Sequence, residues 1–150
     1  MRVDDPSQLK AFVGLMKSLD PKRPFLVQEY VGDRPGEDLR VLVIGGRAIG
    51  AMKRHATDGD FRANISRKGK GASHELCPEV TRMSETAARM LGLEIAGVDL
   101  LFSGNRFVLC EVNSSPGFKG FEEFCGKDVA HEIATYVAEV LDSKTIEKAN

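Results

Sequence analysis

Residues 95–113 read IAGVDLLFSGNRFVLCEVN, and their apolar residues form two runs on either side of Ser103-Gly104-Asn105. Two such runs around a Gly-containing turn predict a pair of antiparallel strands. Since side chains alternate across a strand, one continuously apolar face is expected to pack beneath helices: Val98, Leu100, Phe102, Val108, Cys110 and Val112. The other face would carry Asp99, Glu111 and Asn113.

The register of this hairpin decides whether the three polar side chains meet. A two-residue turn at Gly104-Asn105 would pair Asp99 with Cys110 and would put Asp99 and Glu111 on opposite faces of the sheet. A loop with an odd number of residues, or a bulge, would instead bring all three to one face. We therefore expect an odd loop or a bulge.

Two carboxylates and an amide oxygen on one face would form a set of hard oxygen ligands, which suits Mg²⁺. The alternative is that Asp99, Glu111 and Asn113 are ordinary surface residues on a solvated face, and spacing alone leaves both interpretations open. Cys110 is predicted to be a small core residue rather than a nucleophile, because it falls on the apolar face.

The rest of the chain predicts helices alternating with antiparallel strands. An amphipathic helix is expected after Asp5-Pro6, then a strand over residues 25–31 and a hairpin around Gly45-Gly46. A long polar loop should follow between His55 and His74, and a helix from Pro78 to Gly92. A last helix is expected from Val129. This order indicates an α+β fold, a mostly antiparallel sheet flanked by helices.

Composition excludes several classes of protein. The 150 residues are 42% hydrophobic and 29% charged, with a net charge of −1, which excludes bulk disorder and argues against a nucleic-acid partner. Only 7% of residues are aromatic, so an RNA- or peptide-binding domain is a weak alternative. No apolar run approaches the ~20 residues of a membrane span. The acidic start and three cysteines without a CxxC predict a reduced, cytoplasmic protein with no membrane partner.

Several motifs resemble the RimK-type glutamate ligases of the ATP-grasp family. GVDL at 97–100 and EVNSSPG at 111–117 resemble the end of these enzymes. The same branch has counterparts, in the same order, of VQEYV at 27–31, DLRV at 38–41, GDFRAN at 59–64 and GFKGFE at 117–122. The resemblance spans about residues 25–141. It implies that residues 1–150 are the C-terminal portion of an ATP-grasp domain, without the N-terminal lobe and the upstream glycine-rich loop.

The resemblance also implies roles for particular residues. Asp99, Glu111 and Asn113 would hold two Mg²⁺ ions, for which Mn²⁺ is an alternative, beneath the phosphates of ATP. Nucleotide binding would involve the adenine hinge, a ribose- or phosphate-side contact and part of the 57–73 loop: Glu29, Tyr30, Val31, Asp38, Arg62, Ala63 and Asn64. Arg62 and Arg40 would stabilise the transferring charge as catalytic residues.

Substrate contacts are expected from two further regions. Arg40 and either Lys53 or Arg54 could face the cleft as partners of a carboxylate or phosphate, and Arg67 belongs to the basic loop. Ser114 and Ser115 follow the metal ligands, where the family places the acceptor. For the loop, the open alternative is a solvated basic segment.

The function implied is an ATP- and Mg²⁺-dependent carboxylate–amine ligase that acts through an acyl phosphate. Glutamate is the expected amino acid and a protein or small-molecule carboxylate the expected acceptor. The alternative is a non-catalytic ATP-grasp fragment or binding module. That module would need a partner lobe, or assembly into a homo-oligomer.

Overall fold

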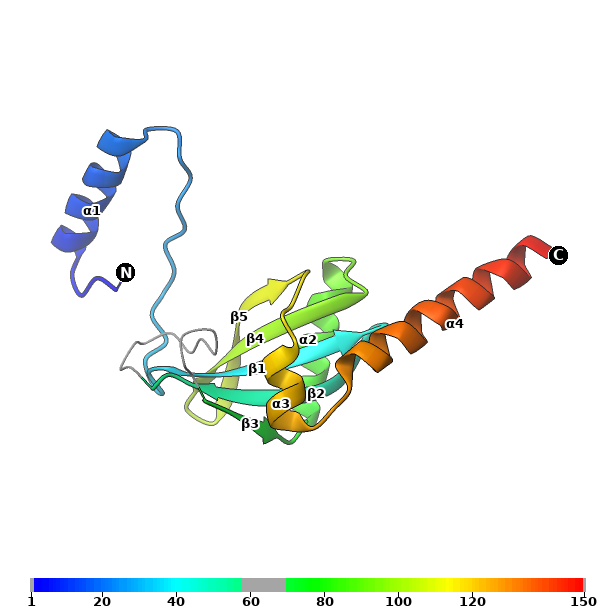
Figure 1. Cartoon of the computed structure of the whole chain (residues 1–150). Helices are drawn as coiled ribbons and strands as arrows, with labels where there is room; N and C mark the ends of the chain where they lie inside the picture. Colours follow the sequence, from blue (N-terminus) through cyan, green and yellow to red (C-terminus); the bar gives the residue numbers. More distant parts are fainter. Residues whose placement is uncertain (1, 58–69, 150) are drawn as a thin grey trace. The chain divides into compact units, whose positions relative to one another are not determined.

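A computed structural model of the protein describes residues 2–57 and 70–149, with side chains as far as residue 143. The elements in chain order are α1 (Pro6–Leu19), β1 (Glu37–Ile44), β2 (Arg47–His55), β3 (Lys70–His74), α2 (Pro78–Met90), β4 (Ile95–Ser103), β5 (Arg106–Asn113), α3 (Lys119–Cys125) and α4 (Val129–Ala149) (Figure 1). Contacts divide the chain into two units, residues 1–30 and 31–150, and each is described by itself.

The first unit contains α1, which begins where the sequence predicts. Asp5 is its N-cap, and one carboxylate oxygen of Asp5 accepts hydrogen bonds from the backbone N–H groups of Ser7 and Gln8 at 2.8 and 2.9 Å. These bonds satisfy amide groups that have no partner inside the helix. The hydrogen bond from the Ser7 hydroxyl, followed by the backbone bond from Gln8, lowers the pKa of Asp5.

The strand predicted over residues 25–31 is not formed. None of these residues belongs to a strand, and Leu26 is 79% exposed. Alternation of apolar residues favours an extended chain, but a strand also needs the backbone of a neighbouring strand. In the described part of the chain, no strand pairs with this segment.

The second unit is built on a five-stranded antiparallel sheet with the order β3-β2-β1-β4-β5. The predicted hairpin of β1 and β2 is present: Ile44 pairs with Arg47 across a two-residue turn in which Gly45 and Gly46 have φ angles of 57° and 76°. This turn type needs positive φ at both central positions, which glycine adopts at little cost. The α+β prediction is confirmed.

The hairpin of β4 and β5 has a two-residue turn and a bulge. Ser103 pairs with Arg106, so the odd loop is not formed, but the register shifts by one residue beyond Leu100–Leu109. Cys110 is the extra residue, and Asp99 consequently pairs with Glu111. The bulge that we expected as the alternative to an odd loop is therefore confirmed.

The bulge also changes which residues of β5 reach the core. Val112 and Phe107 pack against the buried cluster, as the partners of Val98 and Phe102. Val108 is 40% exposed, and Cys110 is half-buried outside both hydrophobic clusters. The prediction that Val108 and Cys110 belong to the core is wrong: the two-residue turn pairs Val108 with Leu101, on the face opposite to that of Phe102, and Cys110 is the extra residue of the bulge.

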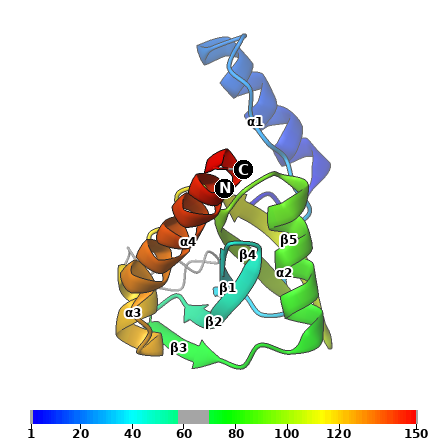
Figure 2. The same cartoon turned by 90° about the vertical axis from the view of Figure 1, so that its right-hand side faces the viewer.

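Helices cover both faces of the sheet, with α2 on one side and α3 and α4 on the other (Figure 2). Beneath α2 lies the larger cluster, which includes Leu39, Val41, Val98 and Leu100, all fully buried. Beneath α3 and the start of α4 lies a smaller cluster: Leu42, Ile44, Met52, Phe121 and Val129. The later turns of α4 continue beyond the sheet (Figure 1).

Two elements in this unit were not predicted. β3 lies inside the stretch that we interpreted as a polar loop, and α3 lies before the last helix, where no element was predicted. Strand β3 and helix α3 are both short, and neither sequence contains enough apolar residues at a regular spacing to predict a helix or a strand. Across the described ranges 2–57 and 70–149, none of the helices combines the length and apolar character needed to cross a bilayer.

Candidate functional site

A row of polar side chains crosses one face of the sheet. Arg40 pairs with Asp99 on one side and with Met52 on the other, so these three positions share a face. By the same alternation, the polar residues of this face come from four strands: Asp38, Arg40, Arg54, Asp99, Glu111 and Asn113. It is the face that α3 covers further along the strands.

Asp99 is held by two arginines. Arg40 donates two hydrogen bonds to it, from Nε to Oδ1 at 2.8 Å and from Nη2 to Oδ2 at 2.7 Å. Arg54 Nη2 lies 2.9 Å from the same Oδ2. Because Asp99 is only 3% exposed, these contacts offset the cost of burying its charge.

Arg54 is shared between Asp99 and Asp38. Its Nε and Nη2 donate to the two carboxylate oxygens of Asp38 at 2.6 and 2.5 Å, a bidentate arrangement. Burial raises the pKa of Asp38, and the hydrogen bonds from Arg54 oppose that rise. Burial lowers the pKa of Arg54, but the hydrogen bonds and charges of Asp38 and Asp99 outweigh it and raise this pKa above its ordinary value.

The register of β4 and β5 brings the three predicted metal ligands to one face of the sheet, as the sequence analysis required. Asp99 pairs with Glu111 and Gly97 with Asn113, so the three oxygen-bearing side chains lie on one face. Asn113 Nδ2 donates to Glu111 Oε1 at 3.1 Å, and this turns the amide nitrogen, not the ligating oxygen, toward Glu111. Two carboxylates and an amide oxygen fit a hard cation such as Mg²⁺. Among the described residues, no group of three or more His, Cys, Asp or Glu side chains is placed to hold a metal ion, and the predicted set has two carboxylates and one amide.

The first hairpin separates the two candidate basic residues. Arg54 lies on the polar face, whereas Lys53 lies on the opposite face, where Nζ is 2.8 Å from Glu37 Oε2. Lys53 Nζ is also 5.7 Å from the centre of the Phe102 ring, which belongs to the cluster under α2. Of the two, only Arg54 therefore faces the same side as Asp99.

The turn after β5 lies close to the metal-ligand strands. Ser114 and Ser115 are exposed, and Pro116 packs on Gly97 so closely that a Cβ at Gly97 would lie 2.7 Å from Pro116 Cβ. The same Cβ would lie 3.7 Å from Arg40 Nε. Gly97 thus lets the turn approach the row of charged residues.

The remaining predicted site residues stay predictions. Arg62, Ala63, Asn64 and Arg67 lie outside the described residues. Glu29 and Tyr30 belong to the first unit, where Arg2 Cζ lies 4.6 Å from the centre of the Tyr30 ring, and Val31 begins the second unit. The adenine hinge that Glu29, Tyr30 and Val31 are predicted to form stays a prediction.

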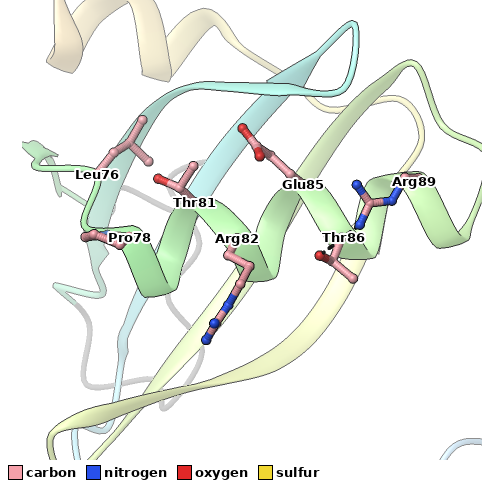
Figure 3. A pocket seen from close by; sticks show the side chains of 7 residues that line it. All are labelled: Leu76, Pro78, Thr81, Arg82, Glu85, Thr86 and Arg89. Atoms are coloured by element: carbon pink, nitrogen blue, oxygen red, sulfur yellow. Dashed lines mark hydrogen bonds between the residues drawn. The ribbon is translucent and has the colours of Figure 1, made fainter.

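A separate open cavity of about 410 Å³ lies along α2, on the other side of the sheet from the polar row (Figure 3). Its lining comprises Leu76, Pro78, Thr81, Arg82, Glu85, Thr86 and Arg89. Glu85 Oε1 also accepts a hydrogen bond from the backbone N–H of Ala48 at 3.0 Å, which ties α2 to β2. Of the predicted site residues that the structure describes, none lines this cavity.

The sequence matches a known family over most of its length. Residues 6–137 match the family model described as the RimK-like ATP-grasp domain. This chain belongs to the RimK-like ATP-grasp family. The resemblance stated from the motifs is confirmed.

The names of similar proteins agree with this assignment. The chain is 44% identical over 131 residues to proteins named probable alpha-L-glutamate ligase from Marinomonas sp. (strain MWYL1) and Syntrophotalea carbinolica. The match covers 87% of this chain and 42% of each relative, so the chain spans less than half of their length.

Solved structures of ATP-grasp ligases share the fold. One is the ATP-grasp ligase PsnB in complex with a phosphomimetic variant of minimal precursor, Mg and ADP. Its TM-score is 0.57 and its sequence identity is 25%. The match covers 69% of this chain and 32% of that chain. Another is PsnB with its minimal precursor, with a TM-score of 0.56 and 28% identity over 69% of this chain and 34% of that chain.

The sequence analysis missed the pairing of Asp38 with Arg54. Counting outward from the Gly45-Gly46 turn pairs Asp38 with Lys53, but a register shift between Leu42 and Val43 makes Arg54 its partner instead. The sequence carries no clear signal for that shift. The one indication of this pairing in the sequence is that Asp38 and Arg54 carry opposite charges on two strands of a predicted hairpin.

Proposed function

We propose that this protein carries the magnesium-holding part of an ATP-dependent carboxylate–amine ligase. The single observation that carries the proposal is the placing of Asp99, Glu111 and Asn113 on one sheet face, in a chain of the RimK-like ATP-grasp family. Residues 1–150 would correspond to the C-terminal portion of the catalytic domain. Glu29, Tyr30 and Val31 would form the adenine hinge.

The proposed reaction has two steps. A carboxylate oxygen of the acceptor attacks the γ-phosphorus of ATP, the bond to the β–γ bridging oxygen breaks, and ADP leaves. The amine of an amino acid then attacks the acyl carbon, phosphate leaves with the bonding electrons, and the amine loses a proton. An amide, ADP and phosphate are the products.

Positioning and charge neutralisation are what the protein would contribute to these steps. Asp99, Glu111 and Asn113 would hold the Mg²⁺ ions, which would neutralise charge on the phosphates. Arg40 lies beside Asp99 with its guanidinium at the same face, where it could pair with the transferring phosphoryl group. Arg62, Ala63, Asn64 and Arg67 are proposed to cover the phosphates, and Ser114 and Ser115 to contact the acceptor.

Glutamate is the proposed amino acid, because relatives at 44% identity are named probable alpha-L-glutamate ligases. The proposed acceptor is the carboxylate of a peptide or small molecule. ATP with two Mg²⁺ ions, or Mn²⁺ in their place, completes the proposed set of ligands. Cytoplasmic location stays a proposal that follows from these substrates.

The test is ADP release with ATP, Mg²⁺, glutamate and short peptides that end in a free carboxylate. We expect release that requires both the peptide and glutamate, together with a peptide mass increased by one glutamyl residue. Aspartate, glutamine and alanine, each supplied in place of glutamate, serve as controls. Release with one of these and not with glutamate would overturn the substrate proposal.

A second measurement separates catalysis from binding. If the protein binds ATP in the presence of Mg²⁺ but releases no ADP with any amino acid, the non-catalytic module becomes the better interpretation. Adding the amino-terminal part of a related ligase would then test whether a partner lobe restores turnover.

A further inference from the structure

The charged residues of the polar face form a row in which the sign alternates. Asp38 contacts Arg54, Arg54 contacts Asp99, and Asp99 contacts Arg40, with nitrogen–oxygen distances between 2.5 and 2.9 Å. These contacts join four of the five charged residues of the face, Glu111 being the fifth, and three of the four are almost fully buried: Asp38 is 8% exposed, Arg54 7% and Asp99 3%. Two negative and two positive charges make the row neutral.

Asp38 lies at the end of this row that is further from Glu111 and Asn113. It pairs with Arg54 on the outer side of β1, while β4 and β5 lie on the other side. Both of its carboxylate oxygens accept hydrogen bonds from Arg54. Its contacts are therefore with the guanidinium, and its route to the metal ligands runs through Arg54.

Arg54 divides its hydrogen bonds unequally between the two acids. Nε and Nη2 both point to Asp38, and Nη2 alone also approaches Asp99. A guanidinium offers paired donors that match one carboxylate at a time. As long as Asp38 takes the pair, Asp99 keeps only one contact with Arg54.

We propose that Asp38 is a positioning residue that anchors Arg54 and so limits how strongly Arg54 competes with a cation for Asp99. This inference rests on the proposed function, since the cation is the Mg²⁺ of the proposed ligase. Without Asp38, Arg54 would turn its paired donors to Asp99, and the row would carry a net charge of +1 beside the metal ligands. Both changes oppose binding of a divalent cation.

The first experiment measures magnesium binding by calorimetry at saturating ATP for the wild type and Asp38→Asn. We expect Asp38→Asn to weaken magnesium binding by about tenfold or more, the range typical when a partner of a metal ligand is lost. Glu37→Gln is the matched control, because Glu37 neighbours Asp38 in β1 but pairs with Lys53 on the opposite face. It should bind magnesium like the wild type.

The double variant Asp38→Asn/Arg54→Gln tests the direction of the argument. If Arg54 is the group that competes, removing it in the Asp38→Asn background should recover most of the lost magnesium affinity. If Asp38 acts only through a contact with the nucleotide, the double variant should bind no better than Asp38→Asn. That second result would overturn the proposal, as would unchanged magnesium affinity in Asp38→Asn.

A nuclear magnetic resonance measurement on the metal-free protein keeps this inference separate from the proposed function. The Nε–H signal of Arg54, assigned by its loss in Arg54→Gln, should change its chemical shift in Asp38→Asn but not in Glu37→Gln. An unchanged signal in folded Asp38→Asn would overturn the positioning role. Should the wild type fail to bind Mg²⁺ and ATP, the proposed function fails, and this signal still decides whether Asp38 anchors Arg54.

Discussion

Asp99 lies directly opposite Glu111 because Cys110 is an extra residue in β5. The turn at Gly104-Asn105 has two residues, and regular pairing from that turn would have put Cys110 opposite Asp99. A bulge adds one residue on one strand and reverses which side chains lie on each face beyond it. This single irregularity decides whether the two carboxylates can act together.

Deletions in β5 test the role of the register. Deleting Cys110 alone should leave Glu111 opposite Asp99, now by regular pairing, and magnesium-dependent ATP binding should persist. Deleting Leu109 and Cys110 together should bring Val112 opposite Asp99 and move Glu111 to the other face, so that binding is lost. Calorimetry measures the binding, and circular dichroism checks that both variants fold. Loss of binding in a folded single-deletion variant would show that the bulge itself, rather than the register, is required.

Gly97→Ala should disturb the turn after the metal ligands. Its Cβ would lie 2.7 Å from Pro116 Cβ, so the turn must shift, and we expect a destabilisation of about 1–3 kcal/mol, as for overpacked sites. Gly117→Ala is the control, because no atom lies within 4 Å of a Cβ at that position. Urea unfolding compares the two. Equal stability of the two variants would contradict the close packing of Pro116 on Gly97.

Glu37 should stabilise the fold only above its titration range. The hydrogen bond from Lys53 holds the pKa of Glu37 below its usual value of 4.5. Because the folded-state pKa is the lower one, this stabilisation is present above pH 4.5 and is lost as the pH falls through the folded-state pKa. Since the pair is partly exposed, we expect Glu37→Gln to cost about 0.2–1 kcal/mol at pH 7.

The check on Glu37 is urea unfolding of the wild type and Glu37→Gln at several pH values. The difference in unfolding free energy between them should shrink below pH 4.5. A difference that stays constant across the acid range would show that Lys53 does not stabilise the ionised carboxylate.

The thiols of Cys110 and Cys125 should react slowly with disulfide reagents at neutral pH. Burial raises the pKa of both, and the carboxylate of Glu111 raises that of Cys110 further. Less thiolate means slower attack. Variants that keep one of these cysteines should react faster in urea and as the pH is raised. Fast reaction of Cys110 in the folded protein at neutral pH would contradict its half-buried position.

Much of the fold can be predicted from local patterns. The Asp5-Pro6 helix start, the Gly45-Gly46 turn and the helix from Pro78 each have a chemical signal within a few residues. Such signals act over short distances in the chain. The strand expected over residues 25–31 failed because a strand depends on a partner that local sequence does not identify.

The site depends on two register shifts, and these limit prediction. The shift at Cys110 was expected as one of two solutions, since only it or an odd loop brings Asp99 and Glu111 together. The shift near Val43 was not expected, and it makes Arg54, not Lys53, the partner of Asp38. A bulge has a weak sequence signal, because it is stabilised by packing across the sheet rather than by its own residues.

The central claim is that Asp99 helps to hold magnesium beneath ATP. Calorimetric titration with ATP, with and without Mg²⁺, tests it most directly in the wild type and Asp99→Asn. We predict tight binding only when the wild type is given Mg²⁺, and no magnesium-dependent gain in folded Asp99→Asn. Equal magnesium-dependent binding by the two proteins would contradict the account.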